Sequence, residues 1–424
     1  MRESGKVPVT DPLQRVDASE APGRADGSRR PEEAGRPKAA RRPRQILPGA
    51  TIGILGGGQL GRMLAHAGGR MGYRFVALDP SPDAPCGHVA DLIVAPYGDR
   101  EAARELARLV DVVTYEFENV DAGVATMLEA ESYVPQGSRL LYTTQNRVRE
   151  KRAVEAAGAR VAPWAEVASL DGLRAAADRL GLPAVLKTAE GGYDGKGQRV
   201  LRHESDLEPA WAELSQAGCP LVLERFIEFE REISVIAARR PSGEVRVFPP
   251  AENVHVDNIL HLSIAPARID DRLRGEAERL AVSIAEALDV VGLLAVEMFV
   301  GRDGALYVNE LAPRPHNSGH YTMEACRTSQ FEQHIRAICD LPLGDTALLT
   351  PVVMVNVLGE HLPALTEWLR RPDEAAERLG VAPKVHLYGK AEARPKRKMG
   401  HVNVLASRTE DALAWIAQSN IWKG

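Results

Sequence analysis

Short apolar runs alternate with amphipathic stretches from Ala50 to about residue 152. The runs 51–55, 75–78 and 112–115 are rich in Val, Ile and Leu and are bounded by glycine or polar residues, so they predict short buried strands. The stretch that follows the first run and ends near Met71 has the apolar spacing of an amphipathic helix. A strand at 133–134 and helices through Arg152 are expected to close a Rossmann-like segment.

Beyond this segment the apolar runs lie closer together and are joined by turn signals, which indicates antiparallel strands. The expected helices are 145–157, 169–180, 204–217 and 270–288, and the expected strands are 161–167, 183–187, 220–227, 232–238, 245–248, 252–255, 294–300 and 305–311. From about Thr350, short strands at 352–357, 385–387 and 402–405 alternate with helices. The predicted fold class is α/β, and α+β for the chain as a whole.

The last two of the antiparallel strands carry two glutamates. The turn 301–304 predicts a four-residue hairpin in which Val300 pairs with Ala305 and Glu297 with Val308, so that Glu310 is the diagonal neighbour of Glu297 on the same face. Two carboxylates so placed repel unless a cation lies between them, and magnesium held by carboxylates and substrate phosphates is the usual case. The alternative is two solvent-facing glutamates, although Glu297 interrupts an otherwise buried run.

A glycine-rich stretch follows the strand that ends at Lys187. Four glycines lie between residues 191 and 197, and such a segment bends closely over a ligand and directs backbone N–H groups at an anion. Lys187 before the loop and Lys196 inside it supply positive charge, so the loop predicts a phosphate cover. A hairpin turn with solvated lysines is the alternative.

A second glycine motif, 56–61, follows the first strand and opens the first helix. With Asp79 about twenty residues further on, this satisfies the dinucleotide-binding fingerprint, so a nicotinamide-dependent dehydrogenase is a rival interpretation. The same amides would hold the single phosphate of a sugar phosphate equally well. The acids in the segment 116–119 follow the strand 112–115, where they either touch a substrate or cap the next helix.

Charge separates the N-terminal residues from the rest of the chain. Residues 1–45 hold 11 Lys/Arg and 7 Asp/Glu, a net of +4, which leaves 53 − 11 = 42 basic and 58 − 7 = 51 acidic residues elsewhere, a net of −9. The segment 1–45 lacks apolar periodicity and is expected to be a disordered basic extension. The net negative charge of the remaining residues argues against a nucleic-acid partner.

Three further features predict a cytoplasmic protein without membrane contact. No apolar run approaches the ~20 residues of a membrane span, and the charged N-terminus lacks an apolar signal segment. The four cysteines are widely separated, which favours reduced thiols.

A basic cluster at 390–401 contrasts with the net negative charge of residues 46–424 and indicates an anion pocket, with a solvated loop as the alternative.

The order of these features resembles the ATP-grasp superfamily over residues 46–424. Three long motifs, 57–63, 190–198 and 312–320, resemble one family within it, the N5-carboxyaminoimidazole ribonucleotide synthetases. The resemblance implies an ATP-grasp fold with an N-terminal Rossmann-like domain (46–147), an ATP-grasp domain (148–349) and a small C-terminal domain (350–424). It also implies a homodimer.

The resemblance implies joining of ATP, bicarbonate and 5-aminoimidazole ribonucleotide, with ADP and phosphate released through carboxyphosphate. The implied nucleotide-binding residues are Arg147, Lys187, Gly192, Tyr193, Asp194, Gly195, Lys196, Gly197, Gln198, Glu224, Arg225, Phe226, Ile227, Glu232, His255, Asn309 and Glu310. The implied acceptor-binding residues are Gly58, Gln59, Leu60, Glu116, Tyr193, Asp194, Lys390, Arg397 and Lys398. Glu297 and Glu310 would hold Mg²⁺, and neither biotin nor NAD is expected.

Catalysis is assigned by the same resemblance to Lys187, Arg314, His316 and Asn317. The last three would hold the bicarbonate-derived carboxylate, with His316 in proton transfer; a structural hydrogen bonder is the alternative for this histidine. The rival functions are another ATP-grasp ligase or carboxylase, such as a biotin carboxylase, then the dehydrogenase, and a non-catalytic nucleotide-binding protein.

Overall fold

The computed structural model describes residues 44–192 and 195–422. The extension predicted at 1–45 lies outside the described residues except for its last two positions, and so do Tyr193 and Asp194 of the glycine loop. The described residues form three sheets, two of four strands and one of nine.

The first sheet is parallel and has the strand order β3-β2-β1-β4. Its strands are β1 (Thr51–Leu55), β2 (Arg74–Asp79), β3 (Asp91–Val94) and β4 (Val112–Tyr115), and its helices are α1 (Gln59–Arg70), α2 (Arg100–Leu109), α3 (Ala122–Glu131) and α4 (Arg139–Thr144). Strand β4 is buried throughout, which is why its sequence is a continuous apolar run. Leu55 pairs with Tyr115, so the segments after β1 and β4 meet at one edge of the sheet.

One predicted element of this segment is wrong. Residues 133–134 do not form a strand; they lie beside β4 with a single hydrogen bond from Val113 N to Tyr133 O of 2.9 Å.

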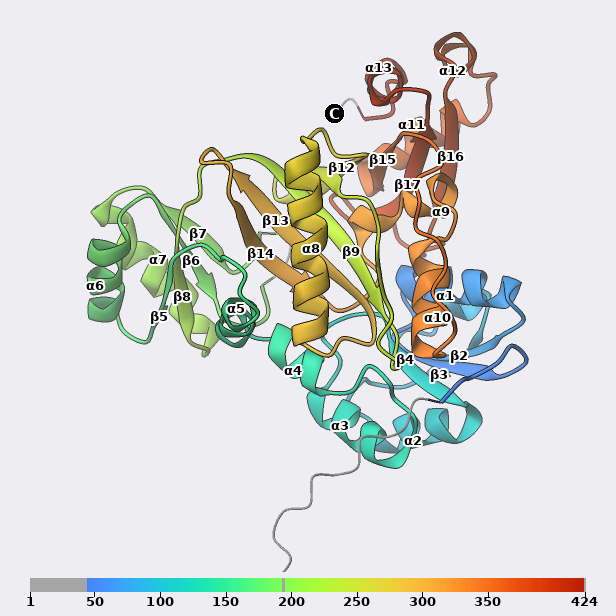
Figure 1. Cartoon of the computed structure of the whole chain (residues 1–424), viewed down its shortest axis with the longest axis horizontal. Helices are drawn as coiled ribbons and strands as arrows, with labels where there is room; N and C mark the ends of the chain where they lie inside the picture. Colours follow the sequence, from blue (N-terminus) through green and yellow to red (C-terminus); the bar gives the residue numbers. More distant parts are fainter. Residues whose placement is uncertain (1–43, 193–194, 423–424) are drawn as a thin grey trace, which may run out of the picture. The chain divides into compact units, whose positions relative to one another are not determined.

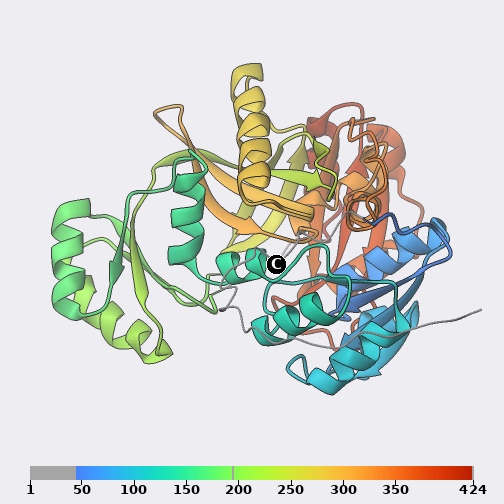
Figure 2. The same cartoon turned by 60° about the horizontal axis from the view of Figure 1, so that its bottom comes forward.

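The second sheet is antiparallel, with the order β5-β8-β6-β7, and Figure 2 shows helices α6 and α7 covering it. Its strands are β5 (Trp164–Val167), β6 (Ala184–Thr188), β7 (Gln198–Leu201) and β8 (Leu221–Arg225), with helices α6 (Leu170–Leu180) and α7 (Leu207–Leu214). The helix expected at 204–217 is α7 flanked by two short 3₁₀ turns, η2 (Glu204–Asp206) and η3 (Ser215–Ala217). The glycine-rich loop joins β6 to β7 as a hairpin.

The third sheet runs through nine strands in the order β14-β13-β9-β11-β12-β15-β17-β16, with β10 beside β9. The strands are β9 (Phe229–Arg239), β10 (Val245–Val247), β11 (Ala251–Val256), β12 (Ile259–Ala265), β13 (Gly292–Gly301), β14 (Leu306–Ala312), β15 (Val352–Leu358), β16 (Ala382–Leu387) and β17 (Lys398–Leu405). Strand β15 pairs with β12, so the C-terminal strands extend the same sheet.

Helix α8 (Asp271–Ala287) packs against β9, and Figure 1 shows it along one face of the β14-β13-β9 region. Its buried residues recur at helical spacing, with Leu273, Ala277 and Ala281 on one face. Asp270 caps its N-terminus by accepting from Leu273 N at 2.7 Å. The other helices are α5 (Arg147–Ala156), α9 (Thr322–Ala325), α10 (Gln330–Ile338), α11 (Leu362–Trp368), α12 (Glu374–Leu379) and α13 (Thr409–Gln418), with 3₁₀ turns η1 (Pro85–His88), η4 (Asn317–Gly319) and η5 (Gly359–His361).

All four cysteines are free, as predicted. Within residues 44–192 and 195–422, no helix combines the length and the apolar character that crossing a membrane requires.

Candidate active site

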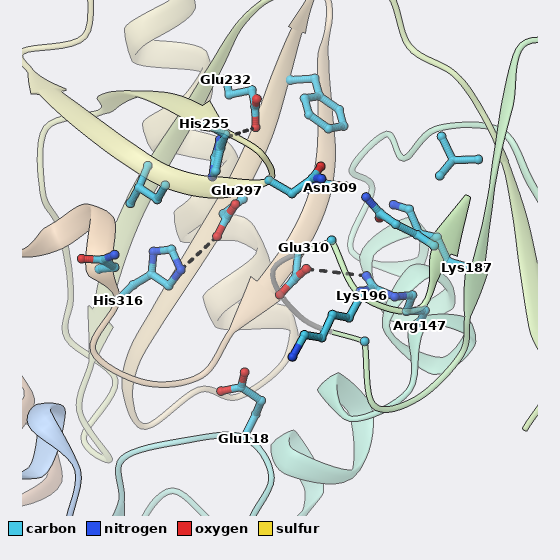
Figure 3. A pocket seen from close by; sticks show the side chains of 18 of the residues that line it. Glu118, Arg147, Lys187, Lys196, Glu232, His255, Glu297, Asn309, Glu310 and His316 are labelled. Atoms are coloured by element: carbon cyan, nitrogen blue, oxygen red, sulfur yellow. Dashed lines mark ion pairs between the residues drawn. The ribbon is translucent and has the colours of Figure 1, made fainter. Parts of the chain in front are cut away.

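A cavity of about 590 Å³ lies where the two antiparallel sheets and the first sheet's loops meet (Figure 3). The predicted residues that line it are Gln59, Leu60, Arg147, Lys187, Gly192, Gly195, Lys196, Gln198, Glu224, Arg225, Phe226, Ile227, Glu232, His255, Glu297, Asn309, Glu310, Arg314, His316, Asn317 and Lys398. The structure therefore brings the predicted nucleotide, metal and bicarbonate residues together in one place.

Lys187 reaches the cavity from β6, and its Nζ lies 3.0 Å from Glu224 Oε2 on the neighbouring strand β8. The second oxygen of Glu224 pairs with Lys151 of α5 at 3.1 Å, and the Lys151 and Glu224 side chains are only 4% and 5% exposed. Burial lowers the pKa of Lys187, whereas the two lysines overcome the burial of Glu224 and hold its pKa at about 2. The carboxylate is charged and clamped between two ammonium groups.

Two described glycines of the loop between β6 and β7 leave little room for a side chain. Thr188 N donates to Gly197 O at 2.8 Å, and both Gly195 and Gly197 have positive φ. A Cβ at Gly197 would lie 2.6 Å from Thr188 Oγ1, and one at Gly195 would lie 2.7 Å from the Asn258 side chain. Glycine is therefore required at both positions.

Helix α5 places Arg147 at the wall of the cavity. Asn146 caps this helix by accepting from Val148 N at 3.0 Å, and its own amide donates to Glu190 Oε1 at 2.8 Å. Arg147 N donates to Ala189 O at 2.9 Å, so the helix start is fastened to the glycine loop. The Arg147 guanidinium lies 3.6 Å from the Glu310 carboxylate.

Glu232 and His255 form a pair on the neighbouring strands β9 and β11. The distance from His255 Nδ1 to Glu232 Oε2 is 3.1 Å, and Figure 3 shows both at the same wall of the cavity. Burial by itself would lower the pKa of His255, but the Glu232 carboxylate, with help from Glu297, raises it overall.

The register of the β13–β14 hairpin differs from the predicted one. Val300 pairs with Leu306 rather than Ala305, so the turn is one residue longer than expected. A bulge then adds Asn309 to β14, and Glu297 lies directly opposite Glu310 rather than opposite Val308. The two glutamates still share one face, and the bulge lets adjacent residues 309 and 310 both line the cavity.

These two carboxylates fit a magnesium ion. Glu297 Oε1 lies 2.9 Å from His316 Nε2, and the Glu310 carboxylate lies 3.6 Å from the Arg147 guanidinium, so each carboxylate faces a nitrogen group across the cavity wall. Mg²⁺ commonly takes one or two carboxylates and completes its shell with water and substrate phosphates. Among the residues that the structure describes, no group of three or more Asp, Glu, His or Cys side chains could hold a metal alone, so water and phosphate oxygens would have to complete the shell.

His316 is oriented from both sides of its ring. Nε2 faces Glu297, and Nδ1 lies 2.8 Å from Ser318 Oγ. Ser318 Oγ in turn contacts Ser234 Oγ at 2.7 Å, which accepts from Asn253 Nδ2 at 3.0 Å. Burial disfavours the charged form of Glu297, but His316 and other nearby cations keep its pKa well below the usual range.

Arg314 and Asn317 lie beside His316. The Arg314 guanidinium forms a two-pronged ion pair with Glu118, with Nη2 3.0 Å from Oε1 and a second, shorter contact from Nε to Oε2. Arg314 holds the pKa of Glu118 at about 2 in spite of burial. Unlike Arg314, Asn317 has no partner for its side chain: both Oδ1 and Nδ2 are buried and lack a hydrogen bond within the described part of the chain.

The N-terminus of α1 does not present its amides as predicted. Gly58 N and Gly61 N both donate to the carboxylate of Glu116, which is buried and does not line the cavity. Burial raises the pKa of Glu116 to about 7. Gly58 and Glu116 do not line the cavity, whereas Gln59 and Leu60 do, and a direct contact of Gly58 or Glu116 with substrate stays a prediction.

Asp79 does not fit the ribose acid of a dinucleotide site. Its side chain is buried and accepts from Gly57 N at 2.8 Å, Ser81 N at 2.9 Å and the Tyr97 hydroxyl at 2.6 Å. Since its oxygens are already bound to the protein, the dehydrogenase interpretation loses its acidic residue.

The basic cluster is divided between the cavity and its surroundings. Lys398, the first residue of β17, lines the cavity. Lys390 lies behind it and donates to Lys398 O at 2.8 Å, and burial, then Arg397 and Lys398, lower its pKa to about 8. Arg397 is exposed and donates to Glu392 O at 2.8 Å, so it stands away from the cavity wall.

Three residues of the site were not singled out by the sequence. Lys151 is buried at the Lys187–Glu224 ion pair, and Ser318 and His320 belong to the motif 312–320. The signal available for Lys151 was weak, because a charged residue on a helix is usually solvated. Glu118 belongs to the acids expected either to touch a substrate or to cap a helix, and in the structure it binds Arg314.

Three family models match consecutive parts of the chain. Residues 49–145 match the ribonucleotide synthetase pre-ATP-grasp domain, residues 152–331 the ATP-grasp domain, and residues 352–414 the phosphoribosylaminoimidazole carboxylase C-terminal domain. With the cavity between the glycine loop and the glutamate hairpin, these matches define the class of the protein as an ATP-grasp ligase.

Individual relatives identify the family within this class more specifically. The chain is 50% identical to the N5-carboxyaminoimidazole ribonucleotide synthase of Bacillus subtilis over 379 residues, which cover 89% of this chain and 96% of that one. A structure of N5-carboxyaminoimidazole synthetase from Staphylococcus aureus with ADP is similar with a TM-score of 0.83 and 39% identity, covering 90% and 99% of the two chains. A structure from Aspergillus clavatus with ADP and 5-aminoimidazole ribonucleotide has a TM-score of 0.80 and 32% identity, covering 87% and 97%. The chain belongs to the N5-carboxyaminoimidazole ribonucleotide synthase family, ATP-dependent ligases of purine biosynthesis.

Proposed function

We propose that this protein carboxylates the amine of 5-aminoimidazole ribonucleotide, using ATP and bicarbonate and releasing ADP and phosphate. The observation that carries the bicarbonate step is Asn317, whose buried amide has no partner among the described residues and lies in the cavity beside Arg314 and His316. Bicarbonate satisfies such a donor and acceptor set, because its carboxylate oxygens accept from an amide N–H and a guanidinium and its hydroxyl donates to an amide oxygen.

The nucleotide would lie between the two antiparallel sheets. Lys187, Lys196 and the amides of the glycine loop bind the phosphates, while the segment 224–227 borders the base and Glu232 accepts from the ribose hydroxyls. Magnesium, held by Glu297 and Glu310, would neutralise phosphate charge during phosphoryl transfer.

Bicarbonate attacks the γ-phosphorus of ATP through one oxygen, and the bond from that phosphorus to the ADP oxygen breaks. The product carboxyphosphate breaks its C–O(P) bond to give carbon dioxide and phosphate. The acceptor amine then attacks the carbon, and its surplus proton leaves to form the carbamate. Each atom is conserved, and no oxidant or reductant is needed.

This chain's residues supply positioning, charge and proton transfer. Arg314 and Asn317 orient the bicarbonate-derived carboxylate, and His316 accepts or delivers the proton, with Ser318 and Glu297 fixing its ring. The glycine loop excludes water, since carboxyphosphate hydrolyses readily.

The remaining features of the proposal rest on the family resemblance and on the sequence. The protein would act in the cytoplasm as a homodimer, with magnesium and without biotin or NAD. Light scattering after size-exclusion chromatography tests the dimer, and chelation of magnesium, which should stop ADP release, tests the metal.

The direct test is an ADP-release assay with the purified protein. ADP should form only when ATP, bicarbonate and 5-aminoimidazole ribonucleotide are all present. Equal ADP formation with biotin or an amino acid in place of the ribonucleotide would favour another ATP-grasp activity. An absorbance change of a nicotinamide cofactor would favour the dehydrogenase.

A further inference from the structure

Three histidine rings from different elements lie one against the next beside the cavity, tilted at the first contact and stacked at the second. The ring centroids of His320 and His401 are 4.7 Å apart, and those of His401 and His386 are 4.6 Å apart. His320 is only 1% exposed, yet it lines the cavity together with Tyr388, whose hydroxyl lies 3.0 Å from His401 Nδ1. The proposed mechanism assigns no role to His320.

Gln330 of α10 fixes which nitrogen of His320 carries the proton. Gln330 Oε1 accepts from His316 N at 2.9 Å, and Gln330 Nε2 donates to His316 O at 2.8 Å. Because the backbone N–H only donates and the carbonyl only accepts, these two bonds determine the orientation of the amide. Gln330 Nε2 also lies 2.9 Å from His320 Nδ1, so Nδ1 must accept and the proton of the neutral ring must be on Nε2.

The surroundings of His320 keep this ring neutral. Burial lowers its pKa well below the usual value, and the positive charges of His316, His386, Lys398 and Arg314 lower it further. His401, whose ring is tilted against that of His320, is also buried, and burial lowers its pKa well below the usual value. A neutral imidazole with Nδ1 already bonded offers one fixed donor, Nε2–H, on the opposite edge of the ring.

We propose that His320 is a substrate-binding residue whose Nε2–H donates to a phosphate oxygen of the acceptor ribonucleotide, with Gln330 as its positioning residue. The inference deepens the proposed function and rests on it, because that function supplies a phosphate monoester as the acceptor. Lys398 lines the same cavity and brings positive charge, with Lys390 behind it, and a phosphate group there requires fixed donors as well as charge. The histidine supplies a donor without adding a buried charge.

Steady-state kinetics of His320→Leu and His320→Gln test the role in binding. His320→Leu should raise the KM for 5-aminoimidazole ribonucleotide about tenfold and leave the KM for ATP within about twofold, because one hydrogen bond to a charged group is lost. His320→Gln places an amide N–H near the position of Nε2 and should restore part of the loss. His261→Leu, on β12 and outside the cavity wall, is the matched control and should leave the KM for the ribonucleotide unchanged. An unchanged KM in His320→Leu, or equal rises for both substrates, would overturn the proposal.

Nuclear magnetic resonance of the wild-type protein labelled with ¹⁵N-histidine keeps the proposal testable if His320→Leu does not fold. The His320 resonances should be those of the neutral Nε2–H tautomer, and the Nε2 resonance should shift on addition of 5-aminoimidazole ribonucleotide but not of ADP. Gln330→Met should give a mixture of tautomers. A protonated ring, the Nδ1–H tautomer or no shift with the ribonucleotide would refute the inference. Failure of wild-type ADP release would instead refute the proposed function and leave the tautomer measurement intact.

Discussion

Glu224 connects the stability of the nucleotide site with its function, because it is the shared partner of two buried lysines. Its two oxygens lie 3.1 Å from Lys151 Nζ and 3.0 Å from Lys187 Nζ, and all three side chains are 11% exposed or less. Glu224→Gln leaves two buried ammonium groups facing a neutral amide. Removal of one member of a buried ion pair typically costs about 3–5 kcal/mol, so we expect a loss of about 4 kcal/mol in the free energy of unfolding.

Lys151→Met removes one of the two buried cations beside Glu224. The ion pair of Lys187 and Glu224 remains and its two charges cancel, so we expect the free energy of unfolding to fall by about 2 kcal/mol, half the loss in Glu224→Gln. Since Glu224 then attracts Lys187 alone, Lys187 is held more tightly away from the nucleotide. We therefore expect the KM for ATP to rise about tenfold in Lys151→Met, with the KM for bicarbonate unchanged.

Urea denaturation followed by circular dichroism measures the stabilities, and ADP release measures the KM values. The matched control is Arg152→Met, on the same helix, whose exposed pair with Glu166 at 3.2 Å should contribute less than about 1 kcal/mol. Equal destabilisation by Lys151→Met and Glu224→Gln, or a smaller loss of unfolding free energy in both than in the control, would refute the shared role of Glu224.

Three further substitutions test two cavity residues and one buried carboxyl group. Glu310→Gln should reduce ADP release at least about 100-fold while stability changes by less than about 1 kcal/mol, because this side chain is 41% exposed and lies 3.6 Å from Arg147; near-normal turnover would remove its role in metal binding. Glu118→Gln should raise the KM for bicarbonate about tenfold and leave that for ATP unchanged, because Arg314 loses its charged partner; equal changes in both KM values would contradict this. In the wild type, burial raises the pKa of the Glu150 carboxyl to about 8, above its value in the unfolded chain. Between pH 4.5 and 8 the folded protein therefore keeps a proton on Glu150 that the unfolded chain has released. The free energy of unfolding should fall as the pH rises through this range, by at most about 1.4 kcal/mol per pH unit. Urea denaturation at pH 5 to 8 should show this slope removed in Glu150→Gln, and parallel curves for the two proteins would contradict the assignment.

The strands and helices of the first segment were predictable because each carries its own periodicity. Strand β1 was predicted at its observed bounds, and α1 ends within one residue of the expected position. Residues 133–134 were mistaken for a strand because an apolar pair looks the same whether it makes one hydrogen bond or a ladder. The joining of the C-terminal strands to β12 is a long-range pairing, which no local pattern encodes.

The chemistry of the site was predictable where residue type and spacing agree. Lys187 and His316 line the cavity, and so do four described residues of the glycine loop, namely Gly192, Gly195, Lys196 and Gln198. The hairpin register was not predictable, because one extra turn residue and the bulge at Asn309 each shift the pairing by one position. Glu116 and Glu118, two residues apart, took different roles because the chain turns after β4, so that one binds backbone amides and the other Arg314.

The nine-stranded sheet has a mechanical consequence. Its hydrogen-bonded strands connect the glutamates of β13 and β14 with Lys398 of β17, so the metal end and the acceptor end of the cavity belong to one continuous frame. A frame of this kind resists a change in the distance between its ends, because such a change would break ladder bonds. Lys187, Glu224 and the glycine loop belong to the four-stranded sheet β5-β8-β6-β7, which has no ladder to that frame. If the protein closes over ATP, we therefore expect the four-stranded sheet to move as a unit, while the distance between the glutamates of β13 and β14 and Lys398 stays constant.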